Sequence, residues 1–364
     1  MTRAILYEFT GSGWDIRHPD FPADDIEWTS ALNAPTELTI SLGNERPGVD
    51  DIVPWLSAFG VLVDGVIRAF GIVTGISADD AALSITCTGV SGYLDGQPWT
   101  DEAIRRYDAD PGELIPLIWE RVQSHRWAAL GVAVDKVATG TRVGEKRDEV
   151  RGADDEVTEQ AVDEPWILDR TETHDLGAEV DALLTEAALE SREVVSLTPT
   201  GAPRFRLEIA PHIGRRRRDV RAEIGDSVYV VPAVEALADD YASDVLLIGA
   251  GEGPDRVVSH ATAPRPSRIR RAFAYSATDV ERQAAADSEA GRVLSAMTPA
   301  RSDVSALEVI DSPTLPVWSL EVGDEIFLAG DFGAAGPADM WVRVVAATSS
   351  LSTPHLRSLE VVPV

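Results

Sequence analysis

A glycine-rich run in the last third of the chain begins like a phosphate-binding loop. Residues 245–248 are apolar, as in a buried strand, and Gly249, Gly251 and Gly253 follow at close spacing. A dinucleotide site needs a helix directly after such glycines, because the amide groups of the helix N-terminus bind the phosphate. Here the third glycine comes one residue early, and residues 254–258 lead into another apolar run. The pattern therefore predicts a glycine-rich connection between strands and no nucleotide site.

The residues that could bind a metal ion or transfer protons are scattered. None of the six histidines has a second histidine or cysteine at metal-ligand spacing: His18, His125, His174, His212, His260 and His355. The acidic pairs lack the glycine-containing pattern of a calcium loop, and there is no G-x-S-x-G nucleophile elbow. We therefore predict no catalytic, cofactor-binding or metal-ligating residues. A carboxylate pair that hydrolyses glycosidic bonds stays open, because 61 acidic residues offer many pairs.

Cys87 and two arginine clusters are the other chemically distinctive residues. Cys87 follows Leu83 and Ile85 in alternation with polar residues, so we interpret it as a small buried side chain on a strand. A single cysteine excludes a disulfide within the chain. The clusters at residues 215–218 and 268–271 could contact phosphates, but the chain around them is strongly acidic. We favour ion pairs with acidic groups, in this chain or a neighbouring copy, over nucleic-acid binding.

Short strands are predicted for residues 1–97. Residues 36–42 alternate strictly, which places three apolar side chains on one face of a strand. Two apolar runs follow, joined by Asp64 and Gly65, a dipeptide that tolerates the positive φ of a tight hairpin turn. Short strands at this spacing, with polar turns between them, indicate a small barrel or sandwich.

Residues 98–225 are expected to combine helices and strands. Asp110 begins a helix signature in which an acid caps the helix and Pro111 takes its first position. A second helix is predicted after Asp175, on a stripe of apolar residues. Between the two helices, residues 140–165 are polar and acidic without periodicity. We expect an exposed loop there.

Residues 226–364 are expected to return to β structure, with one long helix near 278–297. A capping box at Thr278 and Glu281 opens that helix. Apolar runs near the C-terminus are candidate strands: residues 325–328, 340–345 and 355–361. The predicted fold class is therefore α+β and β-rich, with two β-rich ends around an α/β middle region.

The composition is that of a globular protein with a strong negative charge. The 364 residues have a formal net charge of -29, and residues 148–193 include sixteen acidic and three basic residues. Such a balance argues against tight binding to a nucleic-acid backbone, because like charges repel. No apolar run approaches the roughly 20 residues of a spanning helix, and residues 1–10 lack a signal-peptide pattern. We therefore expect a protein made in a cytoplasm, with no membrane-spanning segment.

Three groups of segments, taken in order along the chain, carry a resemblance to a known family. They are residues 34–42 with 83–89, residues 175–179 with 211–216, and residues 241–253 with 318–324. Together they resemble the minor tail proteins of actinobacterial siphophages, within the tail-tip or baseplate hub family of long-tailed phages. The resemblance extends over most of the chain, and the acidic stretch at 140–165 has no counterpart in it.

The resemblance implies a structural role rather than an enzyme. Hub proteins of this kind are homotrimers in which two related barrels per subunit build a ring of quasi-sixfold symmetry. The resemblance implies that two small β-barrel domains of this chain, residues 1–97 and 226–364, flank the α/β middle region. The ring joins the sixfold tail tube to a threefold tip, and DNA passes through it only in transit during ejection. The implied partners are the distal tail protein or tail tube, the tape measure protein and the receptor-binding tip proteins. The implied location is the tail tip of the virion, after assembly in the host cytoplasm, and the family implies neither catalytic residues nor a cofactor.

Two other functions stay open on the sequence alone. One is a cell-wall or polysaccharide hydrolase that uses paired carboxylates, which an activity assay on purified cell walls would reveal. The other is a carbohydrate-binding adhesin, since the nine tryptophans could stack on sugar rings. Most of them lie in apolar runs, as Trp55, Trp119 and Trp341 do, and such positions favour a place in the core. A glycan-binding assay would separate the adhesin from a structural protein.

Overall fold

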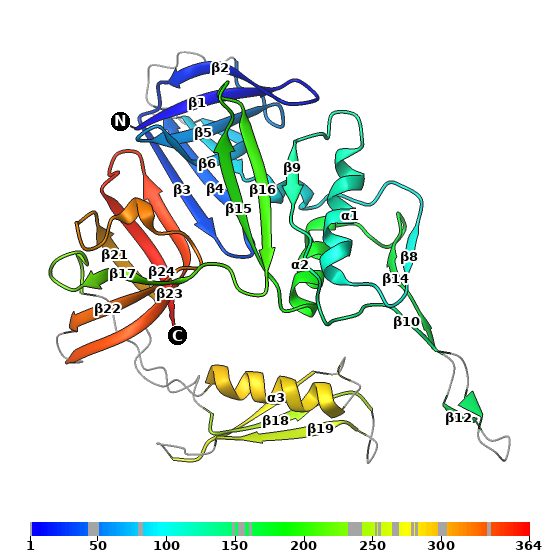
Figure 1. The fold of residues 1–364 in the computed structure, drawn as a ribbon. Helices are drawn as coiled ribbons and strands as arrows, with labels where there is room; N and C mark the ends of the chain where they lie inside the picture. The colour runs from blue at the N-terminus through cyan, green and yellow to red at the C-terminus, as the bar shows by residue number, and fades with distance from the viewer. Residues whose placement is uncertain are drawn as a thin grey trace.

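The structure is a computed structural model in which strands predominate. It describes residues 2–42, 51–78, 83–147, 150–151, 157–159, 162–231, 242–251, 253, 256–263, 269–277, 280, 283–297, 304–332 and 336–364. Three α-helices accompany the strands in these ranges, so the prediction of a β-rich α+β chain is confirmed (Figure 1). None of the described helices is long and apolar enough to cross a membrane.

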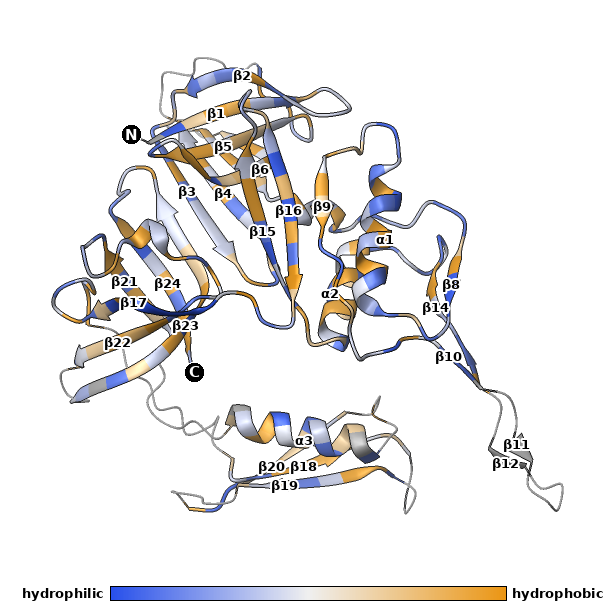
Figure 2. Ribbon diagram, viewed as in Figure 1, coloured by the Kyte–Doolittle hydropathy of each residue, from blue (hydrophilic) through white to orange (hydrophobic). Residues whose placement is uncertain are grey.

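Seven strands form the first half of the main sheet. They are β1 (Thr2–Phe9), β2 (Trp14–Phe21), β3 (Asp25–Ala31), β4 (Ala34–Leu42), β5 (Ser57–Val63), β6 (Val66–Ala78) and β7 (Leu83–Thr88). From Thr36 onward β4 buries every second residue, which confirms the predicted alternation. Asp64 and Gly65 turn β5 into β6 with φ angles of 51° and 79°, the left-handed conformation that this dipeptide tolerates. All residues of β5 are buried, and the strand is coloured mostly as hydrophobic in Figure 2.

Five strands form the second half of the main sheet. They are β17 (Arg216–Glu223), β21 (Ala306–Ile310), β22 (Glu325–Asp331), β23 (Pro337–Ser350) and β24 (Leu356–Pro363). β17 comes before the expected boundary at residue 226, yet it pairs with β22 in parallel and so belongs to this half. The apolar side chains of these strands share one core, which includes Val228, Leu307, Ile326 and Val344.

The two halves are joined into one sheet because β3 pairs antiparallel with β23. The twelve-stranded sheet runs in the order β17-β22-β23-β3-β4-β7-β6-β5-β1-β2, and β24 and β21 branch from β23. The expectation of two β-barrel domains is not confirmed, because the first half stays open between β2 and β3 and the described part of the second half links β21 toward β17 only by single bridges at Val228. The reason is the length of β23: its first part pairs with β22, and its second part extends beyond β22 to reach β3.

The two halves nevertheless repeat one arrangement of four strands. In the first half, the meander β5-β6-β7 is completed by β4, the strand that precedes it in the sequence. In the second half, the meander β22-β23-β24 is completed by β21 in the same way. Every pairing in both sets is antiparallel. The middle strand is the long one in each, with 13 residues in β6 and 14 in β23. This shared order supports the expected kinship of the two β-rich ends.

Two capped helices and a three-stranded sheet make up the middle region. Its elements are α1 (Pro111–Gln123), α2 (Leu176–Glu186), β9 (Val132–Val134), β15 (Glu190–Leu197) and β16 (Pro203–Ala210). The Asp110 carboxylate accepts a hydrogen bond from the Gly112 amide, and Asp175 caps α2 by accepting from the Ala178 amide, as predicted. The middle region shares one core with the first half of the sheet, in which Phe70 packs against Phe205 with ring centroids 4.7 Å apart.

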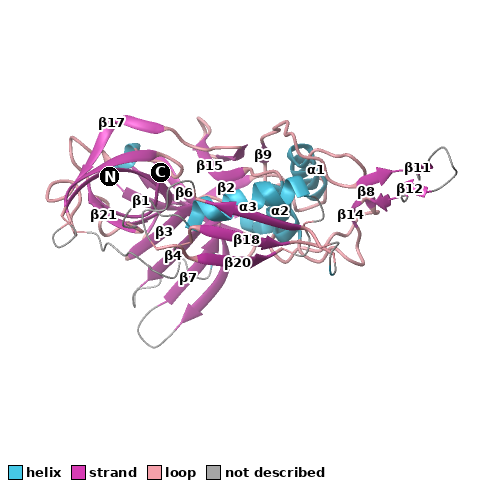
Figure 3. Ribbon diagram, turned by 90° about the horizontal axis from the view of Figure 1, so that it is seen from below, coloured by secondary structure: helices cyan, strands magenta, loops and turns pink. Residues whose placement is uncertain are grey.

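A narrow arm leaves the middle region within the acidic stretch. Its elements are β10 (Glu145–Arg147), β11 (Val150–Arg151), β12 (Val157–Glu159) and β13 (Val162–Glu164), and the pair β8 (Ile104–Arg106) and β14 (Trp166–Leu168) lies at its base. The arm extends away from the rest of the molecule in Figures 1 and 3. The stretch expected to be an exposed loop or excursion therefore contains short antiparallel pairs in its described residues. Antiparallel backbone pairing does not require the apolar periodicity that the sequence lacks.

Residues 242–297 form a small α/β unit instead of joining the second half of the sheet. Its elements are β18 (Asp244–Ile248), β19 (Val258–Thr262), β20 (Ala272–Ser276) and α3 (Gln283–Met297). The strands lie in the order β19-β18-β20, and α3 covers one face of this sheet (Figure 1). Leu247 packs with Ala286 and Ala290 in a core of the unit's own. The predicted long helix is confirmed from residue 283, whereas its capping box at Thr278 and Glu281 lies outside the described residues.

Candidate functional site

The place where the two halves of the sheet meet, here called the joint, is held by polar side chains as well as by the β3–β23 ladder. Thr29 Oγ1 lies 2.8 Å from Thr348 Oγ1 across the ladder. At one end of the ladder, Ser350 Oγ donates to Asp25 Oδ1 at 2.8 Å. These contacts link residues more than 300 positions apart and fix the register of the two halves.

Two tryptophans and two arginines pack together beside the joint. Trp28 on β3 stacks on Trp318 of the second half, with ring centroids 6.0 Å apart and an interplanar angle of 17°. The guanidinium carbons of Arg68, on β6, and Arg357, on β24, each lie 5.4 Å from the centroid of the Trp318 ring. Such contacts stabilise a cation against the face of an indole, and more so when the cation is desolvated.

Arg357 is among the most deeply buried cations of the described residues, at 8% exposure. Its Nε donates to Ser349 Oγ at 3.1 Å, and its Nη1 donates to the carbonyls of Val317 and Leu320, both at 2.9 Å. Burial and, to a smaller extent, the positive charge of Arg68 lower the pKa of Arg357 to about 10, while Glu321 opposes the shift. The guanidinium is therefore held in place by neutral acceptors.

Arginine–carboxylate pairs attach the middle region to the second half. Arg343 on β23 binds Glu190 on β15 through two hydrogen bonds of 2.6 and 2.5 Å, and its Nη2 also donates to the Ile213 carbonyl at 2.8 Å. Burial alone would raise the pKa of Glu190, but the hydrogen bonds from Arg343 and the Ile213 amide outweigh it, and the pKa lies below its ordinary value. A bidentate pair of this kind fixes orientation as well as distance.

A second set of contacts involves two neighbouring residues of β15. Arg192 donates to Glu208 at 2.6 Å and to the Val322 carbonyl at 2.8 Å, and its Nη1 lies 2.9 Å from Glu321. Glu193 faces the first half, where it accepts from the Thr36 amide at 3.0 Å and from the Ser91 amide and hydroxyl at 2.6 Å each. β15 therefore binds both halves of the sheet at once, which makes the joint a three-part contact.

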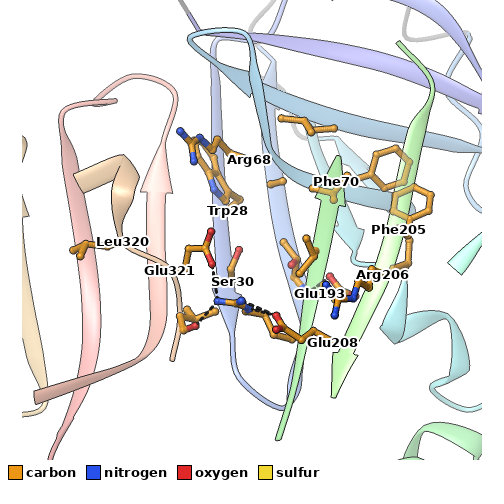
Figure 4. Close-up of a pocket in the computed structure, with 18 of the residues that line it drawn as sticks. Trp28, Ser30, Arg68, Phe70, Glu193, Phe205, Arg206, Glu208, Leu320 and Glu321 are labelled. Carbon is orange, nitrogen blue, oxygen red and sulfur yellow. Dashed lines mark hydrogen bonds and ion pairs between the residues drawn. The ribbon is translucent and has the colours of Figure 1, made fainter. Parts of the chain in front are cut away.

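A cavity of about 290 Å³ lies among these three parts. Figure 4 shows side chains from β3, β6, β15, β16 and the second half converging on it. Four arginines and three glutamates line it: Arg68, Arg192, Arg206, Arg357, Glu193, Glu208 and Glu321. The side chains of Glu321 and Arg206 are 65% and 56% exposed, so they lie where the cavity meets solvent. No grouping of three metal-ligating side chains is found anywhere in the described ranges.

The two arginine clusters singled out in the sequence are largely engaged within the chain. Arg216 pairs with Glu325, and Arg217 contacts both Asp219 at 2.8 Å and Asp324 at 3.2 Å. In the second cluster, Arg270 pairs with Asp244 at 3.0 Å. The expected ion pairs with acidic groups of this chain are present for these three arginines, and Arg268 lies outside the described residues.

The other chemically suggestive residues have ordinary structural roles. After Gly249 and Gly251 the chain returns as strand β19, antiparallel to β18, so the expected connection between strands is confirmed. Cys87 is buried on β7, and burial raises the pKa of its thiol to about 12, as fits an inert side chain. His18, His125 and His260 each lie 3.2 Å from a single carboxylate, that of Asp51, Asp101 and Asp244 respectively.

We expect the small α/β unit to lose stability as the pH falls from about 4 to about 2. Asp244 accepts hydrogen bonds from Arg270, which lower its pKa to about 2 against an opposing effect of desolvation, and Ser243 and Thr262 also donate to it. Because the pKa of Asp244 is lower in the folded protein than the value of about 3.9 in the unfolded chain, its ionised carboxylate stabilises the folded unit at pH values above about 3.9. This stabilisation is lost as the pH falls through the pKa of the folded protein. Hydrogen exchange of β18 amides in the wild type and in Asp244→Asn, compared at each pH, measures the effect. The two proteins should converge at low pH, and a constant difference would contradict the assignment.

Sequence comparisons and structural comparisons give different outcomes. No family model matches the sequence, and no curated protein is detectably similar to it. Among solved structures, the 43 kDa tail protein of prophage MuSo2 from Shewanella oneidensis has a TM-score of 0.61 at 11% identity, covering 99% of this chain and 97% of that chain. The tail protein from Neisseria meningitidis MC58 has a TM-score of 0.56 at 13% identity, covering 100% and 97%. A chain of the Francisella PdpA–VgrG complex has a TM-score of 0.56 at 6% identity, covering 100% of this chain and 52% of the other.

At these identities the likeness establishes the fold and nothing finer. The chain has the fold of prophage tail proteins, and this fold is shared with a VgrG-containing assembly. The narrower resemblance to actinobacterial siphophages stays a prediction. The residues of the joint were not among those singled out by their chemistry in the sequence, because no local pattern marks Arg343, Glu190 or Arg357 as partners of distant segments.

Proposed function

We propose that this protein is a non-enzymatic structural component of a phage tail, the tail-tip or baseplate hub. The observation that carries the proposal is the repeated four-strand arrangement of β4–β7 and β21–β24, within a fold that is shared over nearly the whole chain with prophage tail proteins. A subunit with two similar sheet motifs presents two similar surfaces, and three such subunits present six. That number suits a part that connects a sixfold tube to a threefold tip.

In this proposal, the two halves of the main sheet build the ring; they lie in the segments 1–97 and 226–364, with β17 added to the second, and the rest of the segment 98–225 lies outside the ring. The continuous sheet supports such an arrangement, because the β3–β23 ladder holds the two ring-building motifs in one fixed orientation. A rigid relation between the motifs is needed if they are to occupy alternate positions around one axis. The partners proposed for the two faces of the ring are the distal tail protein or tube on one side and the tip proteins on the other. The tape measure protein is the proposed partner in the channel.

The proposed location is the tail tip of the virion, after assembly in the host cytoplasm, with DNA in contact only during ejection. The net charge of -29 supports a passive channel wall, because an acidic wall repels the phosphate backbone. The engagement of Arg216 and Arg217 in ion pairs of their own chain leaves them less able to bind passing phosphates. This charge argument applies only near the duplex, since the Debye length is about 8 Å at physiological salt.

We expect light scattering of the purified protein to give a mass near that of a trimer. The chain has a mass of 39.1 kDa, so a trimer is about three times heavier, near 117 kDa. A self-assembling ring approaches this mass as the concentration rises, because association follows mass action. Electron microscopy of the same sample should show rings with threefold or pseudo-sixfold symmetry.

A mass that stays at one chain over a wide concentration range, with or without a neighbouring tail protein, would exclude the ring. Activity on purified cell walls would exclude the non-enzymatic part of the proposal. The two measurements are independent, so the assembly and the absence of an enzymatic role are tested separately.

A further inference from the structure

The arginines around the cavity at the joint differ in whether they are paired with a carboxylate. Arg192 is bound by Glu208 and Glu321, and Arg206 is bound by Asp135 through hydrogen bonds of 2.8 and 2.7 Å. Arg68 and Arg357 are the two remaining arginines of the lining, and neither forms an ion pair with a carboxylate of the described residues. Glu321 acts on both of them only from a distance.

The donor atoms of these two arginines are only partly used. Arg68 Nη1 donates to the Trp318 carbonyl at 3.1 Å, while its buried Nε has no hydrogen-bond partner among the described residues. For Arg357, the bonds made to the described residues come from Nε and Nη1, and its Nη2 is not among the buried unpaired atoms, so of these two arginines only Arg68 has a buried donor without a partner. An unsatisfied buried donor is costly, and more so when it carries a charge. Two such cations beside the same indole also repel each other.

We infer that the cavity binds a carboxylate group between Arg68 and Arg357. Arg192 and Arg206 are already bound by carboxylates, so Arg68 and Arg357 are the two lining cations available to a further anion. Guanidinium groups donate in the plane in which a carboxylate accepts, and Trp28 and Trp318 give the cavity an aromatic wall.

The carboxylate can come from a small molecule or from an acidic side chain of another polypeptide that enters at the exposed edge near Glu321 and Arg206. Both sources present the same group to the same two arginines, so the site is defined by the carboxylate and not by its carrier. The inference stands on the lining of the cavity and is independent of the proposed role in a tail.

The test is a titration of the full-length protein with glutarate and, separately, with a short glutamate-containing peptide, followed by calorimetry and by the NMR signals of arginine Nε–H groups. We expect saturable binding of at least one probe and a shift of the Arg68 Nε–H signal. Binding of glutarate alone assigns a small-molecule source, and tighter binding of the peptide assigns a polypeptide source. Failure of both probes to bind would overturn the inference.

The matched variants are Arg68→Gln and Arg206→Gln, two identical changes in the lining of the same cavity. In Arg68→Gln the new side-chain amide can still donate to the Trp318 carbonyl, so the fold should persist. Affinity should nevertheless fall about tenfold or more through the loss of a charge-assisted hydrogen bond. Arg206→Gln should bind nearly as well as the wild type, because that guanidinium is already occupied by Asp135. Equal losses in the two variants would indicate general electrostatic attraction and would contradict a site at Arg68.

Discussion

Replacing Asp324 by Asn should lower the free energy of unfolding of the second half of the sheet by about 3 kcal/mol. Asp324 is 4% exposed, and its carboxylate lies 3.2 Å from Nη1 of Arg217, itself 4% exposed. The same carboxylate accepts from the amides of Arg215 and Glu321 at 3.2 and 3.3 Å. Removing its charge leaves Arg217 buried with one partner fewer, and the loss of a buried partner is far more costly than the loss of an exposed one.

Asp219→Asn is the matched control, because Asp219 is the other carboxylate bound to Arg217. Its side chain is 64% exposed, so solvent screens its pair with Arg217 and the effect on stability should be small. Denaturant unfolding, with hydrogen exchange of β17 and β22 amides to locate the change, measures both variants. Similar losses of unfolding free energy in the two variants would show that burial does not determine how much each ion pair with Arg217 contributes to stability.

Gly214→Ala should destabilise the protein by more than about 3 kcal/mol. Gly214 has a φ of 90°, and a Cβ atom there would lie 2.1 Å from the carbonyl carbon of Gly323 and 2.2 Å from its oxygen. Because the obstacle is backbone, no side-chain rotation relieves the contact. The segment that leads from β16 into β17 would have to move away from the turn before β22, which weakens the attachment of the middle region.

Gly225→Ala separates the steric effect from the conformational one. Gly225 has a φ of 89°, nearly that of Gly214, but a Cβ atom there meets nothing within 4 Å. The free energy of unfolding of this variant should fall only by the cost of placing an alanine in the left-handed conformation, about 1–2 kcal/mol. The difference between the two variants, measured by thermal and denaturant unfolding, reports the backbone contact. If Gly214→Ala lost no more stability than Gly225→Ala, the close approach of the Gly214 and Gly323 backbones would not be what makes Gly214 necessary.

Local patterns predicted the local structure well. The alternation in β4, the hairpin at Asp64 and Gly65 and the helix cap at Asp110 all depend on residues within a few positions of each other. The interactions that determine these features lie within a single segment, so the sequence alone is enough to predict them. The rejection of a nucleotide site at Gly249 also rested on local information, the absence of a helix signal after the glycines.

The joint could not be predicted in this way, because its partners are distant in sequence. Residues 215–218 are four arginines in a row, and nothing local distinguishes Arg217, which is buried with Asp324, from Arg218, which is exposed. Arg357 lies at an inward-facing position of β24 where alternation predicts an apolar residue. A charged residue at such a position is the one signal that could have pointed to a buried contact.

The spacing of the strands indicated a barrel or a sandwich, and the resemblance implied two barrels, but strand spacing does not show which strand edges pair. Whether a sheet closes on itself depends on which edge the last strand meets. Here β23 is long enough to offer a second edge to β3, and that extra length carries no mark in its composition. The resemblance implied a phage tail protein, and the structural comparison shows the fold of prophage tail proteins over nearly the whole chain.

The pairing of β3 with β23 also sets the order of events on the ribosome. β3 is synthesised early, but its partner at residues 346–350 emerges only after some three hundred further residues. At about 5–20 residues per second, the edge of β3 waits roughly 15–60 s for it. During this interval the nascent chain exposes an unpaired strand edge to other chains that are being translated from the same mRNA. The first half of the sheet can fold early, but it cannot be completed until nearly the whole chain has been translated.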